Sequence, residues 1–239
     1  DIFVFGTLRC ETLRKIVLGR DISSDDICRA TIKDFQVYWA KEGPFPVMIP
    51  EPNSEALGLV LKNLSEPDVE RLNYYELGFD YVLAPTYVET HAGQIQVSAY
   101  FCNRSDMATS KLWSFDDWLS DHSEIQYLAA REFLDFFGTK FGDTAQVMYN
   151  SILKRAEVFV TVNSNPTRAL EIGPEMNKSI QVEDLKREYL GFFALNQVDL
   201  KYPFFDNSLS GVKSRTILMG SEASLILPYD PILDKVLLV

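Results

Sequence analysis

The spacing of apolar and polar residues predicts a β-rich first part of the chain. Ile2 to Phe5 form a continuous apolar run, which is typical of a short buried strand. Residues 29–40 alternate apolar with polar or smaller side chains, and residues 55–62 form another strand-like run. Two further runs, 81–90 and 94–102, are separated by a short turn and predict a hairpin.

Two helices are predicted within this part. Residues 12–18 place three apolar side chains on one face, and Gly19 is suited to end that helix. A second helix is expected after Ser65, a typical N-cap residue, with proline and acidic residues in its first turn. Its apolar stripe is predicted to consist of Val69, Leu72 and Tyr75.

The pattern changes after residue 102. Between Ser114 and Arg155, large apolar residues recur at helical spacing, and we interpret them as core positions of packed helices. From Val198 the chain returns to strand-like runs separated by turns, namely 216–218, 223–227 and 236–239. The pattern therefore predicts an α+β chain in three parts, residues 1–102, a helical connector over 103–197, and residues 198–239.

Composition and charge exclude several classes of function. The formal net charge is −11 and no basic patch is visible, which argues against nucleic acids and anionic membranes as partners. No apolar run reaches the roughly 20 residues that a membrane-spanning helix needs. Scattered cysteines and only two histidines, His91 and His122, leave little material for a metal site. The cysteine pattern fits reduced thiols in a cytoplasmic protein.

The first candidate site is the turn that follows the N-terminal apolar run. Phe5, Gly6, Thr7 and Leu8 lead from the strand toward the first helix. Glycine allows the backbone to turn sharply, and successive N–H groups in such a turn form an anion-binding nest. The nearby helix start adds a partial positive charge. The segment is therefore a candidate binding site for a small carboxylate.

The second candidate is Glu76, at the end of the second predicted helix. The carboxyl end of a helix disfavours a negative charge, and apolar neighbours raise the pKa of a carboxyl group by desolvation. Both effects move the pKa of Glu76 toward neutrality, where the group can accept and return protons. The alternative interpretation is a solvated surface glutamate, which is the usual situation of this residue type.

Taken in order, these segments resemble gamma-glutamylcyclotransferase-like domains over residues 2–102. The shared features are a strand ending in Gly-Thr-Leu, a proline-containing stretch, a strand with Gly58, and a Leu-x-x-Tyr-Glu motif before Tyr81. Where the family usually has tyrosine before the glycine, this chain has phenylalanine. The resemblance implies a mixed β-barrel with short helices and a general acid/base at Glu76. It also implies substrate binding by Phe5, Gly6, Thr7, Leu8 and Tyr81.

The chemistry implied by this resemblance is the cyclisation of a gamma-glutamyl amide. The substrate's own α-amine attacks its γ-carbonyl group, which gives 5-oxoproline and releases an amine. The enzyme must hold the substrate carboxylate so that the amine reaches the carbonyl group. One carboxyl group with a raised pKa can move the protons, so the reaction requires no metal or organic cofactor.

The end of the chain resembles the opening strands of Nudix hydrolases of the ADP-ribose pyrophosphatase type. The resemblance involves residues 198–200, 205–208, 227–231 and 236–239, and the whole chain resembles the cyclotransferase–Nudix fusions linked to tellurite resistance. The Nudix catalytic helix, whose glutamates hold Mg²⁺ against a diphosphate, is missing from the sequence. Magnesium is therefore expected only if the natural chain continues beyond Val239.

Three functions remain open at this point. The first is an enzyme that acts on a gamma-glutamyl amide. The second is a non-catalytic accessory or dimerisation module of a Nudix pyrophosphatase, in which Phe5 marks a lost activity, and the third is a binding domain for a small carboxylate. A terminal apolar strand needs a neighbour, and the first strands of the resembling pyrophosphatases help to build a dimer. We therefore expect a homodimer.

Overall fold

The structure is a computed structural model in which the chain divides into two compact units, Asp1–Val160 and Thr161–Val239. The predicted strand at 223–227 and the apolar residues 237–239 lie outside the part of the chain that the structure describes. The described residues are 1–76, 81–102, 104–164, 180–206, 208–220, 229–230, 232 and 234–236.

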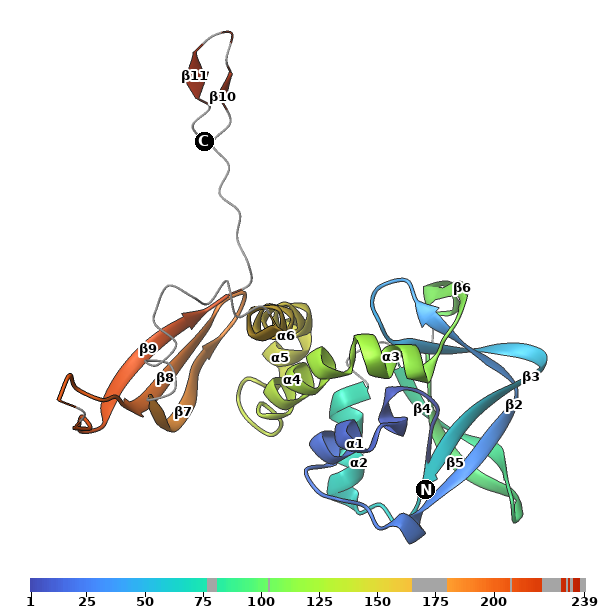
Figure 1. Cartoon of the computed structure of the whole chain (residues 1–239). Helices are drawn as coiled ribbons and strands as arrows, with labels where there is room; N and C mark the ends of the chain where they lie inside the picture. The colour runs from blue at the N-terminus through green and yellow to red at the C-terminus, as the bar shows by residue number, and fades with distance from the viewer. Residues whose placement is uncertain are drawn as a thin grey trace. The chain divides into compact units, whose positions relative to one another are not determined.

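The first unit contains a closed, five-stranded mixed barrel, which agrees with the barrel that the resemblance to gamma-glutamylcyclotransferase-like domains implied (Figure 1). The β1–β5 pairing is parallel, and the other four pairings around the barrel are antiparallel. The short strand β6 (Ala108–Leu112) extends the sheet beyond β2. In the order in which they pair, the barrel strands are β3 (Pro46–Leu61), β1 (Ile2–Val4), β5 (Gly93–Cys102), β4 (Tyr81–Thr90) and β2 (Ile27–Ala40), and β2 pairs again with β3.

Strand β1 lies between β3 and β5 because its three apolar residues are buried on both faces. Phe3 is fully buried and pairs with Val60 of β3 and with Ala99 of β5. Gly58 makes this close approach possible, since a Cβ atom there would lie 2.5 Å from the backbone oxygen of Val4. The chain therefore leaves the barrel at a fixed point, immediately before the Gly-Thr-Leu turn.

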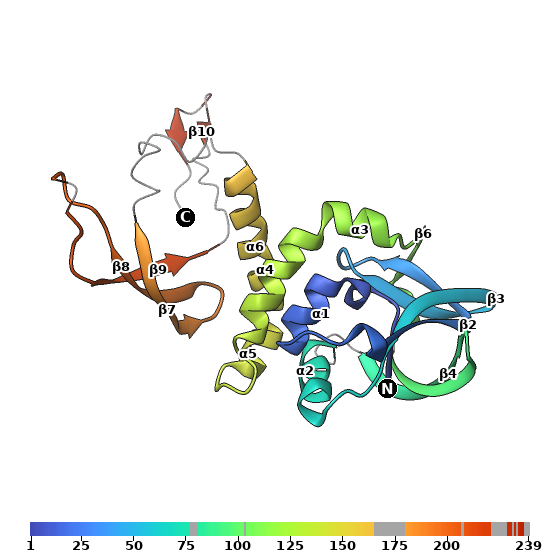
Figure 2. The same cartoon turned by 60° about the horizontal axis from the view of Figure 1, so that its bottom comes forward.

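Helices pack beside the barrel in the same unit, and α1 contacts both α2 and α4 (Figure 2). The helical pattern predicted between Ser114 and Arg155 is confirmed. Among the described helices, none combines the length and the apolar composition that crossing a bilayer requires. The helices are α1 (Glu11–Leu18), α2 (Glu66–Glu76), α3 (Phe115–Asp121), α4 (Ser123–Leu134), α5 (Gly142–Val147) and α6 (Tyr149–Ser164), and the 3₁₀ turns are η1 (Thr7–Arg9), η2 (Ser24–Asp26) and η4 (Ser105–Met107).

Helix α2 is anchored differently from the prediction. Val69, expected in the apolar stripe, is only half-buried, whereas Asp68 is 2% exposed. The Asp68 carboxylate accepts hydrogen bonds from the Ser65 N–H at 2.8 Å and from the Ser65 hydroxyl at 2.7 Å, and it pairs with Arg20. The Arg20 guanidinium and these hydrogen bonds lower the pKa of Asp68 to about 2, so the buried carboxylate stays charged and paired. This capping arrangement orients the helix that ends at Glu76.

The second unit contains a three-stranded antiparallel sheet in the order β7 (Gln181–Leu190), β8 (Ala194–Lys201) and β9 (Lys213–Met219). A short hairpin of β10 (Tyr229–Asp230) and β11 (Lys235–Val236) follows. Strand β7 lies in the segment for which the sequence predicted a helical connector, so that prediction is wrong for these residues. Nearly all residues of β7 are exposed, and a strand with no buried face needs no alternation of apolar and polar positions.

Candidate functional site

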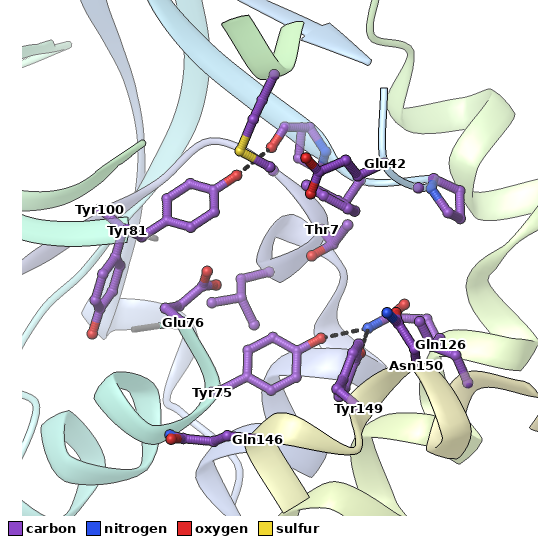
Figure 3. Close-up of a pocket in the computed structure, with 18 of the residues that line it drawn as sticks. Thr7, Glu42, Tyr75, Glu76, Tyr81, Tyr100, Gln126, Gln146, Tyr149 and Asn150 are labelled. Atoms are coloured by element: carbon purple, nitrogen blue, oxygen red, sulfur yellow. Dashed lines mark hydrogen bonds between the residues drawn. The ribbon is translucent and has the colours of Figure 1, made fainter. Parts of the chain in front are cut away.

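A pocket of about 590 Å³ in the first unit brings together all the site residues that the sequence predicted (Figure 3). The turn after β1 forms one part of its wall, the end of α2 another, and the first residue of β4 a third. These segments meet because the barrel carries β1 and β4 on either side of β5. The predicted residues that line the pocket are Phe5, Gly6, Thr7, Leu8, Glu76 and Tyr81.

The turn after β1 is shaped to expose backbone N–H groups. In η1 the Arg9 N–H donates to the Gly6 carbonyl at 3.0 Å, and the Cys10 N–H donates to the Thr7 carbonyl at 2.9 Å. The first N–H groups of such a turn have no partner within it. Gly6 packs directly on Pro46, and a Cβ atom at this position would lie 2.4 Å from the proline Cγ. A larger residue would therefore displace the turn from the pocket wall.

Glu76 is a titratable group of the pocket whose pKa lies near neutrality. Its side chain is half-buried, and desolvation by burial raises its pKa to about 7. Its position as the last residue of α2 acts in the same direction, because the carboxyl end of a helix disfavours a negative charge. Near neutral pH the acid and the carboxylate forms are both populated, as a general acid/base requires.

Tyrosine side chains surround Glu76. Burial raises the pKa of each of them, and the charge of Glu76 adds to this effect, so their hydroxyl groups stay protonated at neutral pH. The Tyr81 hydroxyl donates to the Pro46 carbonyl at 2.9 Å and holds the first residue of β3 at the pocket (Figure 3). The Tyr100 hydroxyl donates to Asn73 Oδ1 at 2.8 Å. The four tyrosines are Tyr75, Tyr81, Tyr100 and Tyr149.

Helices α4 to α6 supply a wall that the sequence did not predict. Asn150, Lys154 and Glu157 recur at helical spacing and share one face of α6. That spacing is visible in the sequence, but nothing in it connects this face with Glu76, because the two meet only through tertiary packing. Among the described residues, no group of three or more His, Cys, Asp or Glu side chains is arranged to hold a metal ion. The residues of this wall are Gln126, Gln146, Val147, Tyr149, Asn150, Leu153, Lys154 and Glu157.

Comparison with known proteins relates the first half of the chain to one family. Residues 2–120 match the family model for gamma-glutamyl cyclotransferase, AIG2-like. AIG2-like protein C of Arabidopsis thaliana is 23% identical over 137 residues, which covers 56% of this chain and 78% of that protein. A solution structure of an Arabidopsis thaliana protein superimposes with a TM-score of 0.40 and 23% identity, covering 57% of this chain and 86% of that chain.

A shorter match concerns a different kind of protein. An ADP-ribose pyrophosphatase of Haemophilus influenzae is 35% identical over 69 residues, which covers 29% of this chain and 32% of that protein. The match is thus limited to about a third of each protein. The matched protein is a pyrophosphatase, whereas the family model describes a gamma-glutamyl cyclotransferase.

Proposed function

We propose, on the premise that residues 2–120 carry a cyclotransferase-like domain of the AIG2-like type, that the pocket cyclises a gamma-glutamyl amide to 5-oxoproline. The observation that supports this most strongly is the presence of Glu76, with a pKa of about 7, in one pocket with the Gly6–Leu8 turn. Cyclisation needs a proton acceptor and a group that holds the substrate carboxylate in place. These two elements are the ones that the pocket combines.

In this proposal the substrate carboxylate binds the backbone N–H groups of Gly6, Thr7 and Leu8, and Tyr81 holds the wall beside it. The Glu76 carboxylate accepts a proton from the α-amine while the amine nitrogen attacks the γ-carbonyl carbon. A new C–N bond forms, and the π electrons of the carbonyl group move to its oxygen. When the carbonyl group re-forms, the bond to the leaving nitrogen breaks, and Glu76 returns the proton to that nitrogen. The products are 5-oxoproline and a free amine.

The proposal is tested by measuring 5-oxoproline release from a panel of gamma-glutamyl amines, amino acids and peptides. Release above the uncatalysed rate for at least one compound supports it, and no release from any compound contradicts it. Calorimetry with the same compounds identifies the third function, a carboxylate-binding domain, because that domain would bind without turnover.

The pH dependence of turnover is expected to follow the ionisation of Glu76. After correction for the ionisation of the substrate amine, kcat/KM is expected to rise with pH and to reach a plateau above a midpoint near 7, since the protonated carboxyl group cannot accept a proton. Initial rates of 5-oxoproline release across this range measure the midpoint. A midpoint near 4.5, the ordinary pKa of a glutamate side chain, would contradict the assignment.

A second candidate function rests on the pyrophosphatase match of 35% identity over 69 residues. In this alternative the chain belongs to a cyclotransferase–Nudix fusion of the tellurite-resistance type, and its first unit is an accessory or dimerisation module. Magnesium-dependent hydrolysis of ADP-ribose then requires the glutamates of a Nudix helix. An ADP-ribose hydrolysis assay with Mg²⁺, made on the natural full-length protein, tests it.

The free thiols of Cys10, Cys28 and Cys102 support a cytoplasmic location for either function.

The proposed homodimer forms through the second unit. Val182, Leu185 and Ile217 share one face of its sheet and are 60%, 55% and 43% exposed, which is typical of an interaction surface. Size-exclusion chromatography with light scattering is expected to give twice the chain mass of 27.2 kDa. Leu185→Lys is expected to yield monomers, whereas Gln197→Lys, on the other face of the sheet, is not. A monomeric wild-type protein at micromolar concentration would rule out the dimer.

A further inference from the structure

A buried arginine binds the backbone of the turn that follows β1. Arg14, on α1, is 7% exposed and does not belong to the residues that line the pocket. Its Nη1 atom donates to the Leu8 carbonyl at 3.1 Å and to the Arg9 carbonyl at 2.6 Å. This nitrogen carries two hydrogens, so it can serve both oxygens at once. Arg14 therefore holds two of the carbonyl groups of η1 in place.

Two chains of hydrogen bonds start at this guanidinium group. In the first chain, Arg14 binds the carbonyl group of Leu8, and the same peptide unit carries the Arg9 N–H. The Arg9 N–H donates to the Gly6 carbonyl at 3.0 Å, and that peptide unit carries the Thr7 N–H. Each hydrogen bond in such a chain polarises the next one, so the charge of Arg14 makes the Thr7 N–H a stronger donor.

The second chain has the same construction, one residue further along. Arg14 binds the Arg9 carbonyl, and the same peptide unit carries the Cys10 N–H. The Cys10 N–H donates to the Thr7 carbonyl at 2.9 Å, and that peptide unit carries the Leu8 N–H. Thr7 and Leu8 both line the pocket, and the first N–H groups of a 3₁₀ turn have no partner within it. Both chains therefore end on donors that the turn itself leaves free for a ligand.

The charge of Arg14 is only weakly balanced by the residues around it. Burial lowers the pKa of its guanidinium group, and the charge of Glu11 offsets this effect in part. Glu11 is exposed, and the two hydrogen bonds of Arg14 go to backbone carbonyls rather than to a carboxylate. Buried charges are usually paired with an opposite charge. A carboxylate bound by the Thr7 and Leu8 N–H groups would supply that charge.

We infer, building on the proposed function, that Arg14 is a positioning residue that strengthens the carboxylate-binding turn from outside the pocket. It fixes the carbonyl groups of η1, so that the Thr7 and Leu8 N–H groups are directed at one ligand, and it adds a positive charge behind them. The ligand is a small molecule with a free carboxylate, here the α-carboxylate of a gamma-glutamyl compound. No bond of the substrate forms or breaks at Arg14, so its contribution is to binding of the substrate.

The direct test compares two substrates that differ only in the carboxylate. They are the best gamma-glutamyl substrate of the panel and its analogue with an α-carboxamide, and the measured quantity is the ratio of their kcat/KM values. Arg14→Met removes the charge and both hydrogen bonds, and this substrate ratio is expected to fall about 10-fold, mainly through KM of the carboxylate substrate. A loss of stability alone leaves the ratio unchanged, because it lowers the amount of folded enzyme for both substrates equally.

Arg71→Met is the matched control. Arg71, on α2, also donates to backbone carbonyls of α1, to Val17 at 2.7 Å and to Ile16 at 3.5 Å, and it does not line the pocket. These carbonyls lie at the other end of α1, so the substrate ratio is expected to keep its wild-type value. Arg14→Lys retains the charge on a shorter side chain without the planar guanidinium group, and its ratio is expected to lie between those of the wild type and Arg14→Met.

The outcomes separate this inference from the proposed function. If the wild type is active and folded Arg14→Met keeps the substrate ratio, only the inference fails, and an equal fall of the ratio in Arg71→Met also overturns it. If Arg14→Met does not fold, a wild-type ratio in Arg14→Lys overturns it.

Calorimetry decides the case in which the wild type releases no 5-oxoproline, so that the proposed function fails. Its probes are 5-oxoproline and the primary amide of 5-oxoproline. The inference stands if the wild type prefers the carboxylate and the Arg14 variants lose that preference, and it fails if the wild type shows no preference. Urea midpoints identify the variants that are folded.

Discussion

Glu76→Gln is expected to lower kcat for 5-oxoproline release by about 10²–10⁴-fold, the usual contribution of a general acid/base. Glutamine has nearly the same size as glutamate, but it can neither accept the amine proton nor return it to the leaving nitrogen. KM is expected to change little, since the substrate carboxylate binds at the Gly6–Leu8 turn. Rates measured with the best substrate of the gamma-glutamyl panel provide the comparison.

The stability of Glu76→Gln shows whether a loss of activity results from unfolding. Burial raises the pKa of Glu76 from 4.5 to about 7, so the folded protein binds this proton more tightly than the unfolded chain does. Between these two pH values, wild-type stability therefore decreases as the pH rises. Glu76→Gln has no carboxyl group to ionise, so it does not lose stability in this way. At pH values above 7 its urea midpoint is therefore expected to be at or above that of the wild type. Wild-type activity in a well-folded Glu76→Gln variant would contradict the acid/base role.

Phe133→Ala is expected to reduce the free energy of unfolding of the first unit by about 3–5 kcal/mol, as is usual when a buried phenylalanine is truncated. Phe133 is fully buried and contacts Tyr74, Tyr75 and Tyr149, so its loss leaves a cavity behind the pocket wall. Tryptophan fluorescence during urea unfolding reports on this unit, because all 3 tryptophans of the chain lie within it. The urea midpoint is expected to fall while the slope stays constant.

Phe133→Leu is the matched variant for this position. It keeps most of the apolar volume, and a loss of only about 1–2 kcal/mol is expected. Because Tyr75 and Tyr149 lose their support in Phe133→Ala, kcat is expected to fall more in that variant than in Phe133→Leu. If both variants unfold at the wild-type urea concentration, Phe133 does not hold the wall together.

The predictions that relied on local chemistry agree well with the structure. Helix α1 ends where expected, with Gly19 at a φ of 72°, because glycine adopts the left-handed conformation without strain. The hairpin of β4 and β5 and the buried strand at the N-terminus also lie close to their predicted limits. Each of these features depends on residues that are near one another in the chain, so the sequence pattern carries the information.

The predictions that failed depended on information that the local sequence pattern does not carry. Asp68 replaces Val69 in the buried face of α2 because Arg20, far away in the chain, supplies the countercharge. Strand β7 was mistaken for part of a helical segment because its exposed residues show no alternation. In both cases the decisive contact or exposure is absent from the local pattern.

By itself, the sequence determined the buried first strand, the first two helices, the hairpin of β4 and β5 and the sharp turn at Gly6, which follow from backbone preferences and periodicity over a few residues. Glu76 was identified as the candidate acid/base from its place at a helix end and from the resemblance to gamma-glutamylcyclotransferase-like domains. Only the tertiary structure decided that β1, between β3 and β5, delivers the turn to Glu76, and that α4 and α6 complete the pocket with Gln126 and Tyr149. The physical reason is that burial and the pKa of about 7 at Glu76 arise from side chains that meet only when the barrel closes and the helices pack beside it.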